Sequence, residues 1–296
     1  MQKVSRDTVI YHMNAQNPPV LYADPGATLL FETRDAGDGQ IKTGKEAYDS
    51  PVKERANPAT GPVYINGAQP GDILSVCIHK IETAERGYMR CGKGKGVLGQ
   101  DLEGGAIKII HIKDDMAYFS EDIKIPLNKM IGVIGTAPAE GSFSCIEPGL
   151  HGANMDCKEI TEGAQVLLPV NVPGALLALG DLHAVMADGE SGVSGLEVVG
   201  NVTLTVDVIK GKNLPLPMVI TPVHVLTIAS HEDLDIATKT AVANMTRYLH
   251  ENHGFELYDA IMLISLAGDV KICQLVNPLK TARVEMPKAY LRNLGG

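Results

Sequence analysis

Short apolar runs separated by glycine and proline make up most of this chain. Such runs, bounded by turn residues, are typical of β-strands. The sequence predicts strands at Thr28–Arg34, Ile73–Ile81, Ile107–Ile112, Ile131–Gly135, Gln165–Val170, Ala175–Asp181, Glu197–Ile209 and Met218–Ile228. Residues 202 to 208 alternate apolar and polar side chains, as a half-buried strand does. This pattern favours a β-sandwich or barrel up to about residue 225.

The pattern changes after Ser230, where apolar residues recur at helical spacing. These residues are Leu234, Ala237, Ala241, Met245 and Leu249. Ser230 and Asp233 resemble a capping box in which Asp replaces the usual Glu. His253-Gly254 is expected to end this helix, because glycine commonly follows the last helical turn.

A second helix is expected over Glu256–Leu266, followed by a strand from Asp269 to Val276. The chain should therefore have two regions. Residues 1–225 form a β-rich sandwich or barrel region that carries the candidate site, and residues 226–296 form an α/β region.

Composition and net charge argue against several classes of function and partner. A net charge of -9 and a pI near 5.5 argue against nucleic acid and anionic membranes as partners. No long apolar run occurs, so we expect neither a signal peptide nor a membrane span. The five cysteines are dispersed and include no C-x-x-C pair, which suits reduced thiols in the cytoplasm.

The densest group of chemically active residues lies at Gly180 to Glu190, directly after an apolar run. It contains Asp181, His183, Asp188 and Glu190, whose oxygen and nitrogen donors suit Zn²⁺, Mn²⁺ or Ca²⁺. If the preceding strand continues to His183, alternation places Asp181 and His183 on one face. Both could then bind one ion.

Two further polar clusters are candidates. The segment His151 to Lys158 contains Asp156, which could bind a metal, and Asn154, which could hydrogen-bond an amide. Its alternative interpretation is a polar turn that satisfies its own backbone. Glu32 and Asp35 follow an apolar strand and could be aimed into a site by a turn, or could form a solvated edge.

Two other segments are weaker. Cys157 is the only cysteine in a polar motif, so it could be a nucleophile, although a small packed residue is the simpler interpretation. The segment Gly92-Lys93-Gly94-Lys95-Gly96 lacks the spacing of a phosphate-binding loop. We expect a mobile surface loop there.

Several motifs resemble those of a known family. Residues 57–65 (Asn-Pro-Ala-Thr-Gly-Pro-Val-Tyr-Ile) and 67–72 (Gly-Ala-Gln-Pro-Gly-Asp) resemble a signature of the acetamidase/formamidase family. His151 to Asp156 is similar to its H-G-G-N-M-D segment, and Gly180 to Glu190 is similar to its G-D-x-H-A-x-x-G-D-G-E segment. The matches run in order from about residue 8 to 285. Ala153 and Ala187 stand where the family usually has glycine, and the added methyl groups could alter substrate preference.

The resemblance implies a mainly β fold: a jelly-roll-like sandwich with a small barrel-like portion and a C-terminal α/β segment. It also implies hydrolysis of short aliphatic amides to carboxylate and ammonia, a divalent metal, and a homo-oligomer, either a dimer or a tetramer. Zinc is the first choice of metal, with calcium as a further possibility.

The expected roles follow from the motifs. The metal ligands are expected among Asp181, His183, Asp156, Asp188, Glu32 and Asp35. Catalytic roles are expected for Glu190 as the base, for Asn154 as a substrate contact and for His151. Two alternatives stay open: an amidase with Cys157 as nucleophile and His151 as its base, and a metal-containing β-sandwich that binds small ligands without turnover.

Overall fold

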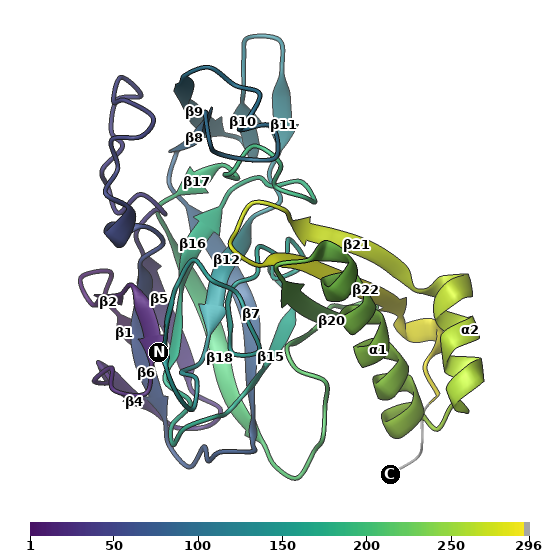
Figure 1. Ribbon diagram of the computed structural model, residues 1–296. Coiled ribbons are helices and arrows are strands. Elements are labelled where there is room, and N and C mark those ends of the chain that lie inside the picture. Colours follow the sequence, from purple (N-terminus) through teal and green to yellow (C-terminus); the bar gives the residue numbers. More distant parts are fainter. Residues whose placement is uncertain (293–296) are drawn as a thin grey trace.

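The apolar runs of the chain form two large β-sheets that pack against each other (Figure 1). The structure, a computed structural model, describes residues 1–292. Most sheet neighbours are far apart in sequence, so the pairing brings distant segments together.

The first sheet has nine strands and is antiparallel, except for a parallel pairing of its first two strands. In spatial order the strands are β1 (Gln2–Val4), β5 (Thr28–Thr33), β18 (Gly200–Ile209), β7 (Ile73–Thr83), β15 (Gln165–Pro169), β19 (Met218–Ile220), β20 (His224–His231), β22 (Lys280–Pro287) and β21 (Asp269–Gln274). Buried and half-exposed residues alternate along β18, as the sequence pattern predicts.

The second sheet has eleven strands. Its main path is β11 (Lys124–Pro126), β10 (Met116–Tyr118), β9 (Gly105–Lys113), β8 (Arg86–Gly92), β17 (Glu197–Val198), β16 (Leu177–His183), β12 (Met130–Gly135) and β14 (Gly152–Asn154). β6 (Ala59–Ile65) pairs with β16, with β2 (Val9–Ile10) and with β4 (Leu21–Ala23). A separate pair is formed by β3 (His12–Asn14) and β13 (Ser142–Ser144).

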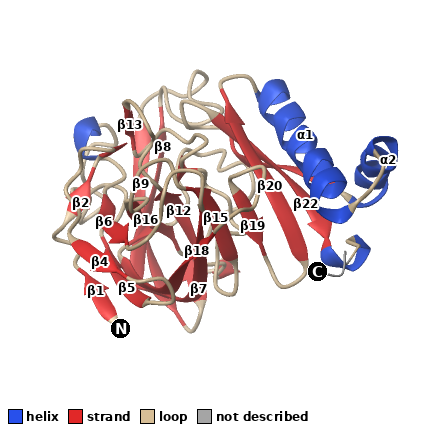
Figure 2. Ribbon diagram, turned by 90° about the horizontal axis from the view of Figure 1, so that it is seen from below, coloured by secondary structure: helices blue, strands red, loops and turns tan. Residues whose placement is uncertain are grey.

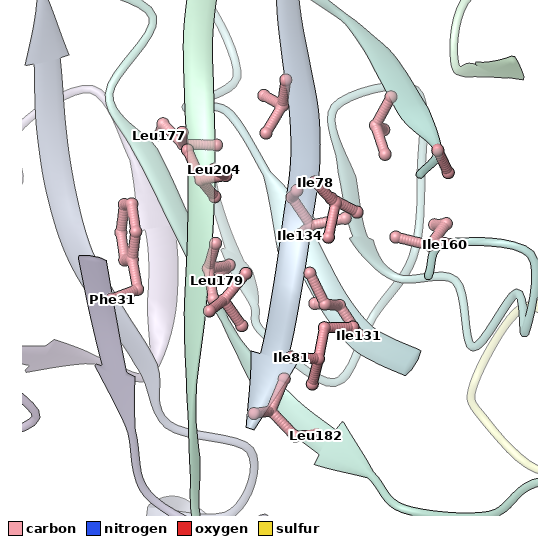
Figure 3. Close-up of a cluster of buried hydrophobic side chains, with 14 of the residues drawn as sticks. Phe31, Ile78, Ile81, Ile131, Ile134, Ile160, Leu177, Leu179, Leu182 and Leu204 are labelled. Atoms are coloured by element: carbon pink, nitrogen blue, oxygen red, sulfur yellow. The ribbon is translucent and has the colours of Figure 1, made fainter. Parts of the chain in front are cut away.

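The main core lies between the two sheets, where removal of apolar side chains from water stabilises the fold. Figure 3 shows these side chains facing one another across the sheets. The first sheet contributes Phe31, Ile78, Ile81 and Leu204, and the second contributes Ile131, Ile134, Leu177, Leu179 and Leu182.

Two helices, α1 (Leu234–His253) and α2 (Leu257–Ala267), lie beside the end of the first sheet, and α1 packs against β20 and β22 (Figure 2). Short 3-10 helices occur at η1 (Lys53–Arg55) and η2 (Lys288–Tyr290). Four of the five apolar positions that predict α1 are fully buried, namely Ala237, Ala241, Met245 and Leu249. The prediction of a mainly β fold with C-terminal helices is confirmed. Among the described residues, no helix is both long enough and apolar enough to cross a bilayer.

The structure corrects several element boundaries. The predicted strand Glu197–Ile209 is divided between β17 and β18, which belong to different sheets. The predicted strand Met218–Ile228 is interrupted by a turn between β19 and β20. The Asn-Pro-Ala-Thr-Gly-Pro segment, where no strand was predicted, contributes its last four residues to β6.

The cap of α1 also differs from the prediction. The N-cap is Asp233, whose side chain accepts hydrogen bonds from the backbone N–H groups of Asp235 and Ile236. Ser230 lies within β20 instead, and its hydroxyl is 2.9 Å from that of Thr281 on β22. The C-cap is Gly254 in the left-handed conformation, as predicted.

Candidate functional site

Four buried carboxyl groups surround the imidazole of His183. Its Nε2 atom lies 3.3 Å from Glu197, 3.5 Å from Asp181 and 4.0 Å from Glu190. Asp156 joins the group through His183 and Glu190, with ligand atoms that lie within 4.8 Å of one another. His183 and the four acidic residues are between 1% and 8% exposed. We refer to them as the His183 cluster.

Segments from three parts of the second sheet position the His183 cluster. Asp181 and His183 end β16, and β17 pairs with this strand so that Glu197 lies opposite His183. Asp156 follows β14, and Glu190 lies in the loop after β16. The neighbouring strands β8, β17, β16 and β12 can be followed in Figure 1.

Gly132 on β12 provides the space for two of the carboxylates. A Cβ atom at this position would lie 2.5 Å from Asp156 Oδ1 and 2.7 Å from Asp181 Oδ2. Both distances are far below van der Waals contact, so any larger residue would displace the carboxylates.

The backbone of the cluster is strained. Asp156, Asp181 and Glu190 have φ values of 44°, 57° and 44°, a left-handed conformation that is uncommon for residues other than glycine. Such strain collects at functional sites, where the surrounding structure enforces it. Asp181 and His183 therefore converge as the sequence suggested, but through a distorted strand end, not through regular alternation.

Three hydrogen bonds hold one oxygen of each of three carboxylates. Asn57 Nδ2 donates to Asp181 Oδ2 over 2.7 Å, and Asn277 Nδ2 donates to Asp156 Oδ2 over 2.6 Å. The backbone N–H of Gly195 donates to Glu190 Oε1 over 3.0 Å. The second oxygen of each of these carboxylates is buried and has no hydrogen-bond partner in residues 1–292.

Six buried polar atoms of the cluster have no hydrogen-bond partner among the described residues. They are Asp156 Oδ1, Asp181 Oδ1, His183 Nδ1, His183 Nε2, Glu190 Oε2 and Glu197 Oε2. Buried polar groups are normally paired, so this set calls for an additional partner. A carboxylate-rich set with one imidazole fits a divalent cation.

The electrostatics of the His183 cluster favour the binding of a positive charge. Burial raises the pKa of Asp156 to about 6, and repulsion from Asp181 contributes. Burial also raises the pKa of Glu197 to about 8 and that of Glu190 well above its usual range. Although burial disfavours a charged imidazole, Glu197 and Asp181 raise the pKa of His183 well above its usual value. The protein alone therefore does not accommodate all of these carboxyl groups in ionised form.

A cavity of about 370 Å³ opens over the cluster. Asp181, Glu190 and Glu197 lie in its wall, together with Asn57 and Asn154. This volume is within the ~300–1,000 Å³ range of sites that bind small molecules. Asn154 Oδ1 is buried and has no hydrogen-bond partner in the described part of the chain, so it can accept a hydrogen bond from a ligand.

The structure places three of the expected metal ligands outside the His183 cluster. Asp188 accepts hydrogen bonds from both terminal nitrogens of Arg283 and lies 3.1 Å from Lys158, so its charge is already balanced. Glu32 forms an ion pair of 2.7 Å with Lys3. Asp35 is used within its own turn, where it accepts a hydrogen bond from the Gly39 N–H.

The structure also separates His151 and Cys157 from the cavity over the cluster. His151 lines a second cavity of about 320 Å³, where its ring centroid lies 5.4 Å from that of Phe143. Cys157 is fully buried beside Cys273 and Arg283. The alternative in which Cys157 attacks the substrate with His151 as base therefore lacks a supporting geometry.

Four residues that form or support the site were not predicted from the sequence, namely Glu197, Asn57, Asn277 and Gly132. Asn57 begins the segment that carried the family resemblance, so its motif was a usable signal. Glu197 and Asn277 reach the cluster only through strand pairing and the C-terminal fold, which local sequence does not reveal.

The known proteins to which this chain is similar are acetamidases and formamidases, the family that its motifs resemble. The sequence model of the Acetamidase/Formamidase family matches residues 7–143 and 139–290. The formamidase of Methylophilus methylotrophus is 32% identical, with 65% of this chain and 62% of that protein covered. The acetamidase of Mycolicibacterium smegmatis is 26% identical, with 71% and 68% covered. The chain thus spans about two thirds of the length of these curated relatives.

Solved structures extend the similarity over nearly the whole chain. The acetamidase of Bacillus halodurans is 43% identical with a TM-score of 0.96, covering 97% of this chain and 98% of that one. A protein of Thermoanaerobacter tengcongensis, described as a predicted acetamidase/formamidase, is 47% identical with a TM-score of 0.95, covering 97% and 96%.

Proposed function

The chain belongs to the acetamidase/formamidase family, and on this basis we propose that it hydrolyses short linear amides to a carboxylate and ammonia at the His183 cluster. The observation that carries this proposal is the set of six buried polar atoms that have no hydrogen-bond partner among residues 1–292, beside a cavity of small-molecule size. Such a set has the chemistry of a metal-assisted hydrolytic centre.

The reaction needs three kinds of assistance. An amide carbonyl is stabilised by resonance, so it must be polarised before water attacks it. The attacking water must lose a proton, and the nitrogen must gain one to leave. Each requirement can be assigned to a group near the cavity.

Two overlapping groups share His183, one with Asp181 and Glu197 and the other with Asp156 and Glu190. Of these residues, Asp156, Asp181, His183 and Glu197 are the ones that we propose would hold a divalent cation, with zinc as the first choice and calcium as a further possibility. When bound, such a cation supplies Lewis-acid polarisation of the carbonyl and lowers the pKa of water towards ~7. Asn57 and Asn277 would orient Asp181 and Asp156, because outer hydrogen bonds fix the direction of a ligand.

Glu190 is the proposed base. The Gly195 N–H holds its Oε1 atom, while Oε2 has no hydrogen-bond partner within residues 1–292 and can accept the proton of water. The same carboxyl group would then deliver the proton to the departing nitrogen. Asn154 Oδ1 would accept a hydrogen bond from the substrate amide and so orient its carbonyl. His151 takes no part in this scheme, because its ring faces the second cavity.

Removal of divalent metal tests the proposal directly. The protein should hydrolyse formamide or acetamide, lose this activity after exhaustive chelation, and recover it when Zn²⁺, Mn²⁺ or Ca²⁺ is returned. Ammonia release measures turnover, and elemental analysis measures bound metal. Full activity in protein shown to be free of metal would contradict the scheme.

Three variants separate the effect on metal binding from the effect on turnover. Asp181→Asn should lower both metal content and turnover, because it removes a ligand charge. Glu190→Gln should retain most of the metal while turnover falls by ~10²–10⁴-fold, the usual contribution of a general base. Glu32→Gln is the matched control, since Glu32 lies outside the His183 cluster and should affect neither quantity.

We also propose a cytoplasmic location and a homodimer or homotetramer. The location is supported by five free cysteines and the oligomer by the exposed apolar side chains of α2, including Tyr258, Met262 and Leu266. The named relatives support a small amide as the partner, and the acidic net charge argues against nucleic acid and anionic membranes as partners.

A further inference from the structure

The outer part of the cavity over the His183 cluster is larger and more cationic than a small neutral amide requires. Acetamide has four non-hydrogen atoms and would fill only a fraction of about 370 Å³. Besides the carboxylates of the cluster, the cavity wall contains Lys53, Arg90 and Lys95. The ligand of this cavity must therefore account for both its volume and its three cationic side chains.

Strand pairing brings Arg90 to the cavity. Tyr88 on β8 pairs with Glu197 on β17, so β8 runs directly beside the carboxylates. Arg90 lies two residues further along β8 and therefore on the same face as Tyr88, about 6.6 Å away along the strand. Its backbone is fixed by Ser194, whose hydroxyl accepts a hydrogen bond from the Arg90 N–H over 3.1 Å.

Lys95 is brought to the cavity by the glycine-rich segment 92–96, which we expected to be a mobile surface loop. The structure packs this segment against the loop that carries Glu190, through a hydrogen bond of 2.9 Å from the Val97 N–H to the Ser191 carbonyl. Gly96 permits the approach: a Cβ atom there would lie 2.7 Å from the same carbonyl, and its φ is +75°.

None of the three cations forms an ion pair with a carboxylate within 4.0 Å in residues 1–292. By contrast Lys93, two residues before Lys95, pairs with Glu103. Burial and the nearby charges of Arg90 and Lys53 lower the pKa of Lys95, so these cations repel one another without compensation.

We propose that Arg90 and Lys95 bind a carboxylate of the substrate, so that the preferred substrates are short amides with a terminal carboxylate, such as malonamate or succinamate. A guanidinium group presents two parallel N–H donors that match a carboxylate, and Lys95 adds a point charge. The amide end then reaches the His183 cluster, while the intervening methylene groups keep the two negative ends apart. This inference rests on the proposed amide hydrolysis.

The chemical step is unchanged by the additional carboxylate. Water forms the new C–O bond, the C–N bond breaks, and the nitrogen leaves with the protons of the water. Succinamate and water therefore give succinate and ammonium, with atoms and charge balanced.

The test compares two nearly isosteric substrates on the full, metal-loaded protein. The kcat/KM for succinamate should exceed that for the neutral succinamide by about tenfold or more, as expected for a charge-assisted contact. Arg90→Gln and Lys95→Gln should each lower the ratio of kcat/KM for succinamate to that for acetamide by about tenfold, mainly through KM. Lys95→Arg should restore most of that ratio.

Lys93→Gln is the matched control, because Lys93 lies on the same loop but does not line the cavity. It should leave the ratio unchanged. Equal kcat/KM values for succinamate and succinamide would overturn the inference while acetamide hydrolysis still supports the proposed function. Equal losses for succinamate and acetamide in Lys95→Gln and Arg90→Gln would also overturn it.

A binding measurement decides the case in which no amide is hydrolysed and the proposed function fails. Titration calorimetry with succinate should then give binding to the metal-loaded protein that is about tenfold weaker in Lys95→Gln and unchanged in Lys93→Gln. Absence of succinate binding to the unmodified protein would overturn the carboxylate site itself.

Discussion

Gly132 lies on β12 between the residue pairs that join this strand to β16, and its missing side chain leaves the space occupied by the carboxylates of Asp156 and Asp181. A strand interior otherwise gains from a side chain that packs, so glycine there often marks the close approach of another group. The cluster therefore depends on a residue that contributes no chemistry of its own.

Gly132→Ala should move at least one carboxylate by enough to disturb the site. We expect amide turnover to fall by ~100-fold, because a misplacement of about 1 Å has this effect. Overpacking should also lower the free energy of unfolding by about 1–3 kcal/mol. Gly192→Ala is the control, since a Cβ atom at Gly192 meets nothing within 4 Å. Equal turnover in the two variants would contradict the steric argument.

His151 should make folding stability depend on pH. Burial lowers its pKa from 6.5 to about 4. Between these values the unfolded chain binds the proton and the folded protein does not, so this residue lowers stability as the pH falls from about 6.5 to about 4. His151→Gln should flatten this part of the curve in urea unfolding measured at a series of pH values. An unchanged slope would show that the imidazole stays solvated.

At the residue level, the sequence identified the members of the His183 cluster that lie in dense polar motifs. Asp156, Asp181, His183 and Glu190 belong to segments in which glycines flank several ionisable groups. Asp188 belongs to the same motif, yet it pairs with Arg283, which is 95 residues away. Only the folded chain reveals that partner.

Among the elements, α1 was the most predictable, because its apolar face follows from helical periodicity alone. The residue that caps α1 was not predicted correctly. Ser230 has the right chemistry for a cap, but β22, which the sequence analysis did not predict, extends β20 through Ser230. β17 and β18 show the same limitation, because one continuous strand pattern in the sequence conceals a change of sheet between them.

The cap assignment can be tested by two substitutions. Asp233→Ala should lower the free energy of unfolding by about 0.5–2 kcal/mol, because two backbone N–H groups of α1 lose their acceptor. Glu232→Ala, an adjacent exposed position, should change it by less than ~0.5 kcal/mol. Thermal or urea unfolding followed by circular dichroism measures both. A larger effect at Glu232 would contradict the assignment.

For the whole molecule, the first sheet continues across the division expected at residue 225. Residue 225 lies within β20, which pairs with β19 on one side and with β22 on the other. A secondary core joins Ile73 and Leu167 to Val225, with Tyr248 of α1 packed against it. The change to helical spacing of apolar residues after Ser230 predicted the helices correctly. It did not show that both regions share one sheet. The last four residues of the 226–296 region lie outside the described residues.

Shared packing should make unfolding cooperative. We expect the metal-free protein to show one calorimetric transition, coincident with the loss of both β-sheet and helix signals in circular dichroism. A C-terminal region that melted separately would instead give two transitions. That outcome would favour independent folding of residues 1–225 and 226–296.

The segment from Cys273 to Arg283 completes the His183 cluster. Backbone hydrogen bonds join Gly189 to Cys273 and Leu275, Asn277 holds Asp156, and Arg283 anchors Asp188. A nascent chain on the ribosome exposes the carboxylates of the centre well before this segment has been synthesised. The centre therefore cannot take up this arrangement before residues 273–283 have been synthesised, and a cation captured earlier would meet ligands that are not yet held in place.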